Sequence, residues 1–253
     1  MLENQHHPRI SVVIPTHNEA RNLYQVLPHI PSIVSEVVLV DGHSTDDTVS
    51  VAQQLLPRIH IIKQAGKGKG NALQAGFAAC TGDIIVMLDA DGSTNPNEIP
   101  RFVEALHRGN DFAKGSRFVQ GGGSNDITLL RGLGNYGLCK LVNALFFAQF
   151  SDLCYGYNAF WKHCLDYMQI DCDGFEVETL ISLRIHKANL KIVEVPSFEH
   201  LRIHGQSKLH AFRDGWRVLK TIIRERSRVM PPQTHVYQPV TSSLEEQLSQ
   251  PRR

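Results

Sequence analysis

The sequence predicts an α/β fold in which a mostly parallel sheet is covered by helices on both faces. Short apolar strands alternate with stretches of helical periodicity in βαβαβ order, and several helix starts carry capping residues. Such units connect with one handedness and build a Rossmann-like layer architecture. The 253 residues, 42% of them hydrophobic and 20% charged, are enough for one main globular domain with appendages.

The first half of the chain supplies most of this sheet. The expected strands span residues 10–15, 36–41, 59–64, 84–89 and 111–116. The helices expected between them span residues 19–27, a segment after Ser44, 71–79 and 96–107. Residues 44–47, Ser-Thr-Asp-Asp, are expected to cap the second helix with acids in its first turn, which gives these carboxylates a structural role.

The second half changes pattern after residue 116. It contains a glycine-rich loop at 120–124, a long helical stretch at 131–150, a strand at 191–198 and an amphipathic helix at 212–226. We therefore expect a flexible amino terminus (1–9), a catalytic domain (10–210), a carboxy-terminal amphipathic helix (211–230) and a disordered tail (231–253).

Composition excludes several functional classes. The formal net charge of +1 argues against a nucleic-acid partner for the molecule as a whole. Five cysteines without a C-x-x-C spacing argue against a disulfide framework or a zinc site and favour a reducing compartment. The polar amino terminus and the absence of ~18 consecutive apolar residues predict cytoplasmic residence without a membrane-spanning helix.

The strand at 84–89 ends in two carboxylates, Asp89 and Asp91, separated by Ala90. Ligands collect at the carboxyl ends of strands in open α/β sheets, so a cation held here would neutralise the pyrophosphate of a nucleotide. The alternative is a solvated turn.

The first strand leads into residues 15–19, Pro-Thr-His-Asn-Glu, without the G-x-G-x-x-G of dinucleotide binding, and residues 66–71 lack the spacing of a Walker loop. The two lysines of that loop either approach a nucleotide or belong to a turn that opens the next helix.

Several motifs together resemble a known family. VIPTHNE at 13–19, Val40-Asp41-Gly42-x-Ser44-x-Asp46, Asp89-Ala90-Asp91 and Gly115-Ser116-Arg117 resemble, in order and spacing, family 2 glycosyltransferases of the GT-A fold. Arg131, GYNAF at 156–160 and Arg202-x-x-Gly205-x-Ser207-Lys208 extend the likeness to the polyprenyl-phosphate (dolichol-phosphate) mannosyltransferase group. The resemblance covers about residues 10–226.

The resemblance implies roles for individual residues. Those expected to bind the nucleotide are Pro15, Thr16, His17, Glu19, Asp41, Lys69, Asp89, Ala90, Asp91, Arg202 and Lys208. Asp89 and Asp91 are expected to hold Mg²⁺ or Mn²⁺. The residues expected to act in catalysis are Asp91, Arg117, Arg131 and Asp152. A departing nucleoside diphosphate develops negative charge, which a divalent cation and arginines stabilise; the alternative for each arginine is a surface ion pair.

The catalytic base stays open among Asp152, Glu176 and Glu178. A lipid phosphate is already an anion and needs positioning by Arg117 and Arg131 more than it needs a base. Glu176 is equally explained as a helix-start carboxylate. His200, His204 and His210 are expected to make ordinary hydrogen bonds or nucleotide contacts, with one of them a candidate to complete the coordination of the cation.

Two segments suggest a membrane surface. Residues 138–150 are apolar but too short to span a bilayer, and the last helix combines Trp216 with basic residues. The alternative is that this helix packs its apolar stripe on the domain or on a second subunit of a homo-oligomer.

The expected function is therefore a metal-dependent, inverting glycosyltransferase at the cytoplasmic face of a membrane. It would move a hexose from a nucleotide-sugar to a polyprenyl phosphate or another lipid. The donor stays open among GDP-mannose, a UDP-hexose and UDP-glucuronate, because His17 and Gly42 stand where the group commonly has an aromatic residue and a paired acid. The alternatives are transfer to a soluble acceptor and a noncatalytic nucleotide-sugar-binding protein, whereas a nucleotidyltransferase is disfavoured.

Overall fold

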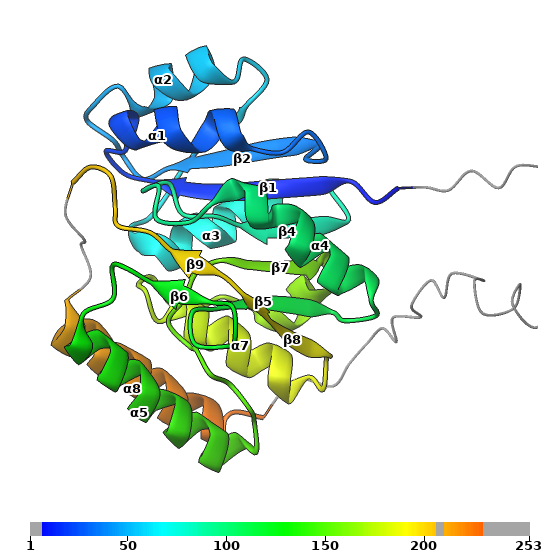
Figure 1. Cartoon of the computed structure of the whole chain (residues 1–253), viewed down its shortest axis with the longest axis vertical. Helices are drawn as coiled ribbons and strands as arrows, with labels where there is room; N and C mark the ends of the chain where they lie inside the picture. Colours follow the sequence, from blue (N-terminus) through cyan, green and yellow to red (C-terminus); the bar gives the residue numbers. More distant parts are fainter. Residues whose placement is uncertain (1–6, 206–209, 230–253) are drawn as a thin grey trace, which may run out of the picture.

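The computed structural model describes residues 7–205 and 210–229, arranged as a central sheet between layers of helices (Figure 1). Its elements are β1 (Ile10–Thr16), α1 (Ala20–Val26), η1 (Leu27–His29), β2 (Glu36–Asp41), α2 (Thr48–Leu55), β3 (His60–Lys63), α3 (Gly68–Ala79), β4 (Ile84–Met87), η2 (Pro96–Glu98), α4 (Ile99–His107), β5 (Phe112–Ser116), β6 (Gly123–Ser124), α5 (Leu129–Phe146), β7 (Asn158–Trp161), η3 (Lys162–Cys164), α6 (Leu165–Met168), α7 (Val177–Lys187), β8 (Ile192–Pro196), β9 (Phe198–Glu199) and α8 (Ala211–Ser227).

The central sheet has seven strands in the order β3-β2-β1-β4-β7-β5-β8. The mostly parallel α/β fold is confirmed, since β7 alone of these strands runs antiparallel to its neighbours. The strand β7 was not predicted. Its pairing sets Asn158 opposite Met87 at the carboxyl end of β4, so the segment just before β7 lies beside the Asp-Ala-Asp motif.

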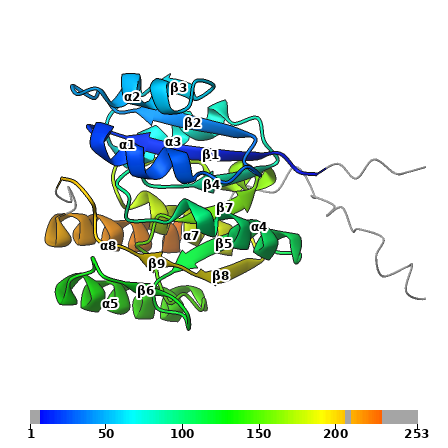
Figure 2. The same ribbon diagram turned by 45° about the horizontal axis from the view of Figure 1, so that its top comes forward.

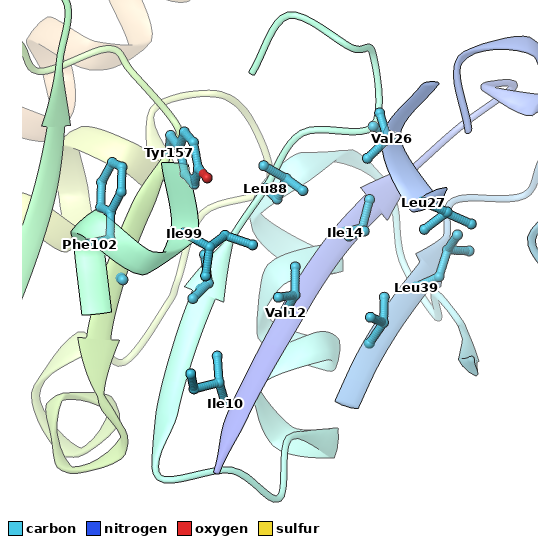
Figure 3. Close-up of a cluster of buried hydrophobic side chains, with 14 of the residues drawn as sticks. Ile10, Val12, Ile14, Val26, Leu27, Leu39, Leu88, Ile99, Phe102 and Tyr157 are labelled. Carbon is cyan, nitrogen blue, oxygen red and sulfur yellow. The ribbon is translucent and has the colours of Figure 1, made fainter. Parts of the chain in front are cut away.

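Alternate residues of the strands enter different cores, because successive side chains of a strand point to opposite faces. Val12 and Ile14 of β1 join a core closed by α1, α2 and α4, part of which is drawn in Figure 3. Val13, between them, joins a second core closed by α3, α6 and α7. Helices therefore cover both faces of the sheet, which leaves the carboxyl ends of its strands open to a ligand.

The helices α5 and α8 form a further layer outside α7 (Figures 1 and 2). Val142 of α5, Leu183 of α7 and Val218 and Ile222 of α8 share a third buried cluster. Val218 and Ile222 therefore pack on the domain, whereas Trp216 and Ile223 of the same helix are exposed. No helix in the described ranges is both long and apolar enough to cross a membrane.

Charged side chains also hold α8 on the domain. The guanidinium of Arg184 on α7 lies 2.8 Å from Glu225 on α8 and 2.8 Å from Asp171. Arg184 and Glu225 are fully buried, and Lys187 donates to the Glu225 carbonyl at 2.6 Å. A buried pair of this kind fixes geometry, because separating it would leave a charge without compensation.

The predictions for two helices, α2 and α5, differ from the structure. The helix α2 begins at Thr48 and has no acid in its first turn; instead the Asp46 carboxylate accepts from the amides of Thr48 and Ala20. Partial burial alone would raise the pKa of Asp46, but these hydrogen bonds lower it. The helix α5 ends at Phe146 instead of residue 150.

The predictions of a flexible amino terminus and a disordered tail fall mostly on residues 1–6 and 230–253, outside the described part of the chain. Within the expected flexible terminus, Arg9 is tied to the segment before the central strand β4: its amide donates to the Asp83 carboxylate at 2.8 Å.

Candidate active site

A cavity of about 890 Å³ opens at the carboxyl ends of β1 and β4 and beside the first turns of α3, α7 and α8. Its size suits a nucleotide-sugar, since ligand cavities range from about 300 to 1,000 Å³. Of the predicted site residues, it is lined by Pro15, Thr16, His17, Glu19, Lys69, Asp89, Ala90, Asp91, Arg131 and Arg202. Three others, Asp41, Arg117 and Asp152, do not line it, and Lys208 lies outside the described residues.

The carboxylate of Asp89 is paired with a buried ammonium group. Lys69 Nζ lies 2.6 Å from Asp89 Oδ1 and 2.6 Å from Glu178 Oε1. Burial alone would lower the pKa of Lys69, but the two carboxylates raise it, so the group is protonated at neutral pH. Burial raises the pKa of Glu178, and Lys69 acts in the opposite direction. Lys69, Asp89 and Glu178 therefore place one ammonium group and two carboxyl groups at the end of β4.

Lys69 reaches this position because three glycines permit close backbone approach. A Cβ added to Gly68 or Gly70 would lie 2.0 Å from the carbonyl oxygen of Asp173 or Cys172, respectively. The helix α3 begins at Gly68, not at Asn71 as predicted, and both lysines of the glycine-rich segment, Lys67 and Lys69, line the cavity.

Gly156, in the segment before β7, also permits a close approach of the backbone to Lys69. A Cβ there would lie 2.6 Å from Lys69 Nζ and 2.7 Å from Glu178 Oε1. The backbone before β7 can pass this close to the charged group only without a side chain.

The second carboxylate of the motif is paired with an arginine. Arg202 Nη2 lies 2.6 Å from Asp91 Oδ2, and Arg202 Nη1 lies 3.4 Å from Glu19. Asp91 Oδ1 accepts from the Ser93 amide and hydroxyl at 2.9 and 2.6 Å. Asn22 holds the arginine's segment in place through two hydrogen bonds to the backbone of His204. The residues predicted from β1, β4 and the segment after β9 thus converge.

Asp89 and Asp91 fit a hard divalent cation as partial ligands. Both line the cavity, and carboxylate oxygens are the donors that Mg²⁺ and Mn²⁺ prefer. No group of three or more His, Cys, Asp or Glu side chains suited to a metal occurs in residues 7–205 and 210–229. Phosphate oxygens of a bound nucleotide would therefore complete the coordination, as is usual for Mg²⁺.

The ends of β1 and β2 form the opposite wall. His17 Nδ1 lies 2.7 Å from the Gly42 carbonyl oxygen. A Cβ at Gly42 would lie 2.9 Å from Gln64 Oε1 and 3.0 Å from the Thr16 carbonyl, so a side chain at this position would have to displace Gln64. Asp41 is buried and accepts from the Ser44 amide at 3.1 Å, so it shapes the loop behind the cavity.

Arg117 and Asp152 are not placed as predicted. Arg117 Nε and Nη2 donate to the two oxygens of Asp152 at 2.7 and 3.0 Å, and Arg117 Nη1 donates to Glu199 at 3.0 Å. The side chains are only 3% and 0% exposed, and the ring of Tyr155 covers the guanidinium at 4.9 Å. Asp152 is wrong as a catalytic base because both of its oxygens are occupied away from solvent. The pair braces the segment that leads into β7.

Of the two arginines predicted to act in catalysis, Arg131 is the one that lines the cavity. Its amide donates to the Thr128 hydroxyl that caps α5, and its Nη1 lies 3.3 Å from Asp126. The two remaining candidates for the catalytic base differ in position. Glu176 precedes α7 and does not line the cavity, whereas Glu178 lines it. None of His200, His204 and His210 lines it.

Sequence reasoning missed several cavity residues. They come from five segments and are Asp126, Cys154, Tyr155, Asp173, Phe175, Glu199, Arg213, Asp214 and Arg217. Burial raises the pKa of the Cys154 thiol to about 12, so it is protonated and unsuited to nucleophilic attack. The spacing of Arg213 and Arg217 on one amphipathic helix was a usable signal, but it was interpreted as a membrane or packing face.

Comparison with known proteins identifies the family. Residues 11–166 match the profile of "Glycosyl transferase family 2". The chain is 32% identical over 211 residues to a dolichol-phosphate mannosyltransferase of Pyrococcus furiosus, covering 79% of this chain but 59% of that protein. It is 29% identical over 219 residues to a dolichyl-phosphate hexose transferase of Haloferax volcanii, covering 85% of this chain and 92% of that protein. The chain thus spans about three fifths of the length of the Pyrococcus protein.

The fold is shared with solved structures. Glucosyl-3-phosphoglycerate synthase from Mycobacterium tuberculosis, in complex with Mn²⁺, UDP and phosphoglyceric acid, superposes with a TM-score of 0.69 at 22% identity, covering 89% of this chain and 80% of that one. Its complex with Mg²⁺ and UDP gives 0.67 at 21% identity, covering 89% and 81%. The predicted GT-A-type fold is confirmed.

Proposed function

Since the chain belongs to glycosyltransferase family 2, we propose that it transfers a hexose from a nucleotide-sugar to a polyprenyl phosphate. The observation that carries the proposal is the convergence of Asp89, Asp91 and Arg202 on one wall of a cavity of nucleotide-sugar size. The names of the archaeal relatives, which act on dolichol phosphate, support the acceptor class. The nucleotides bound to the mycobacterial enzyme support a nucleoside diphosphate donor.

In this proposal, the part of the cavity around Asp89 and Asp91 binds the diphosphate leaving group of the donor. Asp89 and Asp91 would bind Mg²⁺ or Mn²⁺, which supplies positive charge to the departing diphosphate. Lys69 and Arg202, each 2.6 Å from one of these carboxylates, add cations of the protein at the same place. This charge is preorganised before the reaction, so it stabilises the transition state without reorganisation.

The acceptor step needs orientation more than proton transfer. An oxygen of the acceptor phosphate forms a bond to the anomeric carbon while the bond from that carbon to the donor diphosphate breaks. The nucleoside diphosphate leaves with the electron pair, and the configuration at the carbon inverts. Because a phosphate at neutral pH is already an anion, no base is required, and Arg131, which lines the cavity, would help to orient it.

A peripheral membrane contact accords with this acceptor. The exposed apolar residues of α5 include Leu129, Leu133 and Tyr136, and those of α8 include Phe212 and Trp216. Both helices border the cavity through their first turns. We propose that these side chains lie against the headgroup region of a bilayer, where aromatic and basic residues are favoured.

A second candidate is transfer to a soluble acceptor. It is favoured by Glu178, a cavity-lining carboxylate whose pKa is raised by burial, as a general base for a hydroxyl requires. The mycobacterial structure that shares the fold contains phosphoglyceric acid.

The test is a transfer assay with labelled GDP-mannose, UDP-glucose and UDP-glucuronate, with Mg²⁺ or Mn²⁺, against a short polyprenyl phosphate and 3-phosphoglycerate. The proposal predicts label in the organic phase, dependent on the polyprenyl phosphate and the cation. Label transferred to 3-phosphoglycerate alone would favour the second candidate. Donor binding without transfer to any acceptor would reject both.

A further inference from the structure

We infer that Arg213 and Arg217, in the first two turns of α8, form the binding position for the acceptor phosphate. The inference rests on the proposed function and adds its acceptor-recognition residues. Both arginines line the cavity, and they come from an element that contributes nothing to the strand-end charges. A cavity with one charged wall for the donor diphosphate and a second cationic wall is suited to two phosphate-bearing substrates.

The two guanidinium groups share one face of the helix. Residues four apart on a helix are neighbours, so Arg213 and Arg217 converge on the same region of space. Their side chains are 59% and 49% exposed, compared with 10% for Lys69 and 20% for Arg202. They are thus accessible to a ligand, whereas Lys69 and Arg202 are already enclosed by protein.

The charge balance around the arginines leaves them available. Arg213 Nε lies 3.4 Å and Arg217 Nη1 lies 3.7 Å from the same oxygen of Asp214. The other oxygen of Asp214 accepts from the His210 amide at 2.7 Å. Lys69 and Arg202, by contrast, each contact two carboxylates, with 2.6 Å as the closest distance. A second acid, Glu176, lies beside Arg217, since a Cβ on Gly174 would lie 2.4 Å from Glu176 Oε2 and 2.8 Å from Arg217 Nη1. The contacts of both arginines with Asp214 are longer than those of Lys69 and Arg202 with their carboxylates, so they can yield to a phosphate.

The surrounding structure holds the arginines at the cavity. Gly174 lies next to Arg217: a Cβ on Gly174 would lie 2.8 Å from Arg217 Nη1. The far half of α8 is fixed by the buried pair of Arg184 and Glu225 and by Ile222. The guanidinium groups therefore project from a rigid element, which reduces the entropy lost on binding.

The chemistry favours a phosphate monoester. Arginine donates paired N–H groups to phosphate oxygens, and two arginines together match a dianion better than a single negative charge. The rival explanation is that Arg213 and Arg217 contact anionic lipid headgroups. Their position in the cavity lining favours the substrate, and the rival is an outcome of the test.

The test measures binding of geranyl phosphate to the full chain by calorimetry, in solution and without vesicles. The variant R213Q/R217Q is compared with R226Q, which removes an exposed arginine of the same helix that does not line the cavity. We expect the double variant to bind geranyl phosphate at least about tenfold more weakly, since two charge-assisted contacts are lost, and R226Q to bind like the wild type. UDP and GDP binding should be unchanged in both variants.

The outcomes separate the inference from the function on which it rests. If the wild type and R213Q/R217Q bind geranyl phosphate equally, the inference is overturned and the proposed function stands. The inference is also overturned if R213Q/R217Q binds geranyl phosphate like the wild type but, in a separate assay, cosediments less with anionic vesicles, because the arginines then contact the bilayer. If the wild type does not bind geranyl phosphate but transfers sugar to a soluble acceptor, the polyprenyl-phosphate function fails, and the inference fails with it.

Discussion

The strand-end wall of the cavity, formed around Asp89 and Asp91, differs from the helical layer of α5 and α8 in how tightly its charged side chains are paired. At the strand end, Lys69 and Arg202 are enclosed and held within 2.6 Å of carboxylates. On α8, Arg213 and Arg217 are about half exposed and share a distant carboxylate. The first wall is preorganised for a compact anionic ligand, and the second is open to a ligand that extends out of the protein. We infer that donor and acceptor specificity are encoded in separate parts of the fold.

The largest effect should follow from Asp91→Asn. Removing this charge leaves Arg202 without its closest partner and removes one proposed metal ligand, so kcat should fall at least about 100-fold with little change in stability. The matched control is Asp47→Asn, an exposed residue outside the cavity, which should keep the wild-type rate. Equal transfer rates for the two variants would remove the strand end from the mechanism.

The anchoring of α8 should dominate stability. Glu225→Gln removes the buried partner of Arg184 and should lower the free energy of unfolding by about 3 kcal/mol, measured by urea denaturation. Asp171 still holds the arginine, which keeps the loss at the lower end of the range for buried pairs. The exposed pair of Arg108 and Glu104 is the control, and Glu104→Gln should leave the urea midpoint unchanged. Similar midpoints for both variants would contradict a rigid α8.

A methyl group at Gly156 should affect the strand end selectively. Gly156→Ala places a Cβ against Lys69 and Glu178, so the donor kcat/KM should fall about tenfold or more through displaced charges. At Gly137 of α5 a Cβ would meet no atom within 4 Å, and Gly137→Ala should preserve the rate and slightly raise the melting temperature. An unchanged donor kcat/KM in Gly156→Ala would show that the close approach has no role in the reaction.

Acid should loosen the helical layer through Asp171. Burial alone would raise the pKa of Asp171, but hydrogen bonds from Arg184 and Arg228 lower it. A lowered pKa means that its stabilisation is complete above the ordinary value of 3.8 and is lost as the pH falls through the lower, folded-state pKa. Asp171→Asn should therefore melt at a lower temperature than the wild type at pH 7, and the difference should shrink below pH 3.8. A constant difference across this range would contradict the assignment.

The exposed aromatic residues should matter least for the folded protein. The double variant Phe212→Ser with Trp216→Ser should change the free energy of unfolding by less than about 0.5 kcal/mol, because both side chains are exposed. It should nevertheless reduce cosedimentation with vesicles. Unchanged cosedimentation would argue that the helical layer does not contact the bilayer through these residues.

The fold and part of the site were predictable because they depend on local signals. Apolar strands and helix periodicity gave β1 to β5, and the family resemblance named Arg131 and Arg202, both of which line the cavity. The strand β7 was missed because its partners in β4 and β5 are distant in sequence and its own residues carry no alternation.

Side-chain directions at the site were harder to predict. Arg117 follows a strand end, as cavity residues do, but a carboxylate 35 residues away draws it into the interior. The start of α3 at Gly68 was missed because the approach of residues 172 and 173 to its glycines exists only in the folded chain. Both errors concern tertiary contacts that single-sequence patterns do not encode.

The most direct test of the strand-end site is a thermal melt with UDP or GDP, with and without Mn²⁺, on the wild type and Asp91→Asn. A ligand at 100 times its Kd stabilises the native state by about 2.7 kcal/mol, enough to raise the melting temperature measurably. We predict that one nucleotide raises the wild-type melting temperature only with Mn²⁺ and that Asp91→Asn abolishes the rise. A rise of equal size without the cation, or in the variant, would contradict a donor diphosphate held at Asp89 and Asp91.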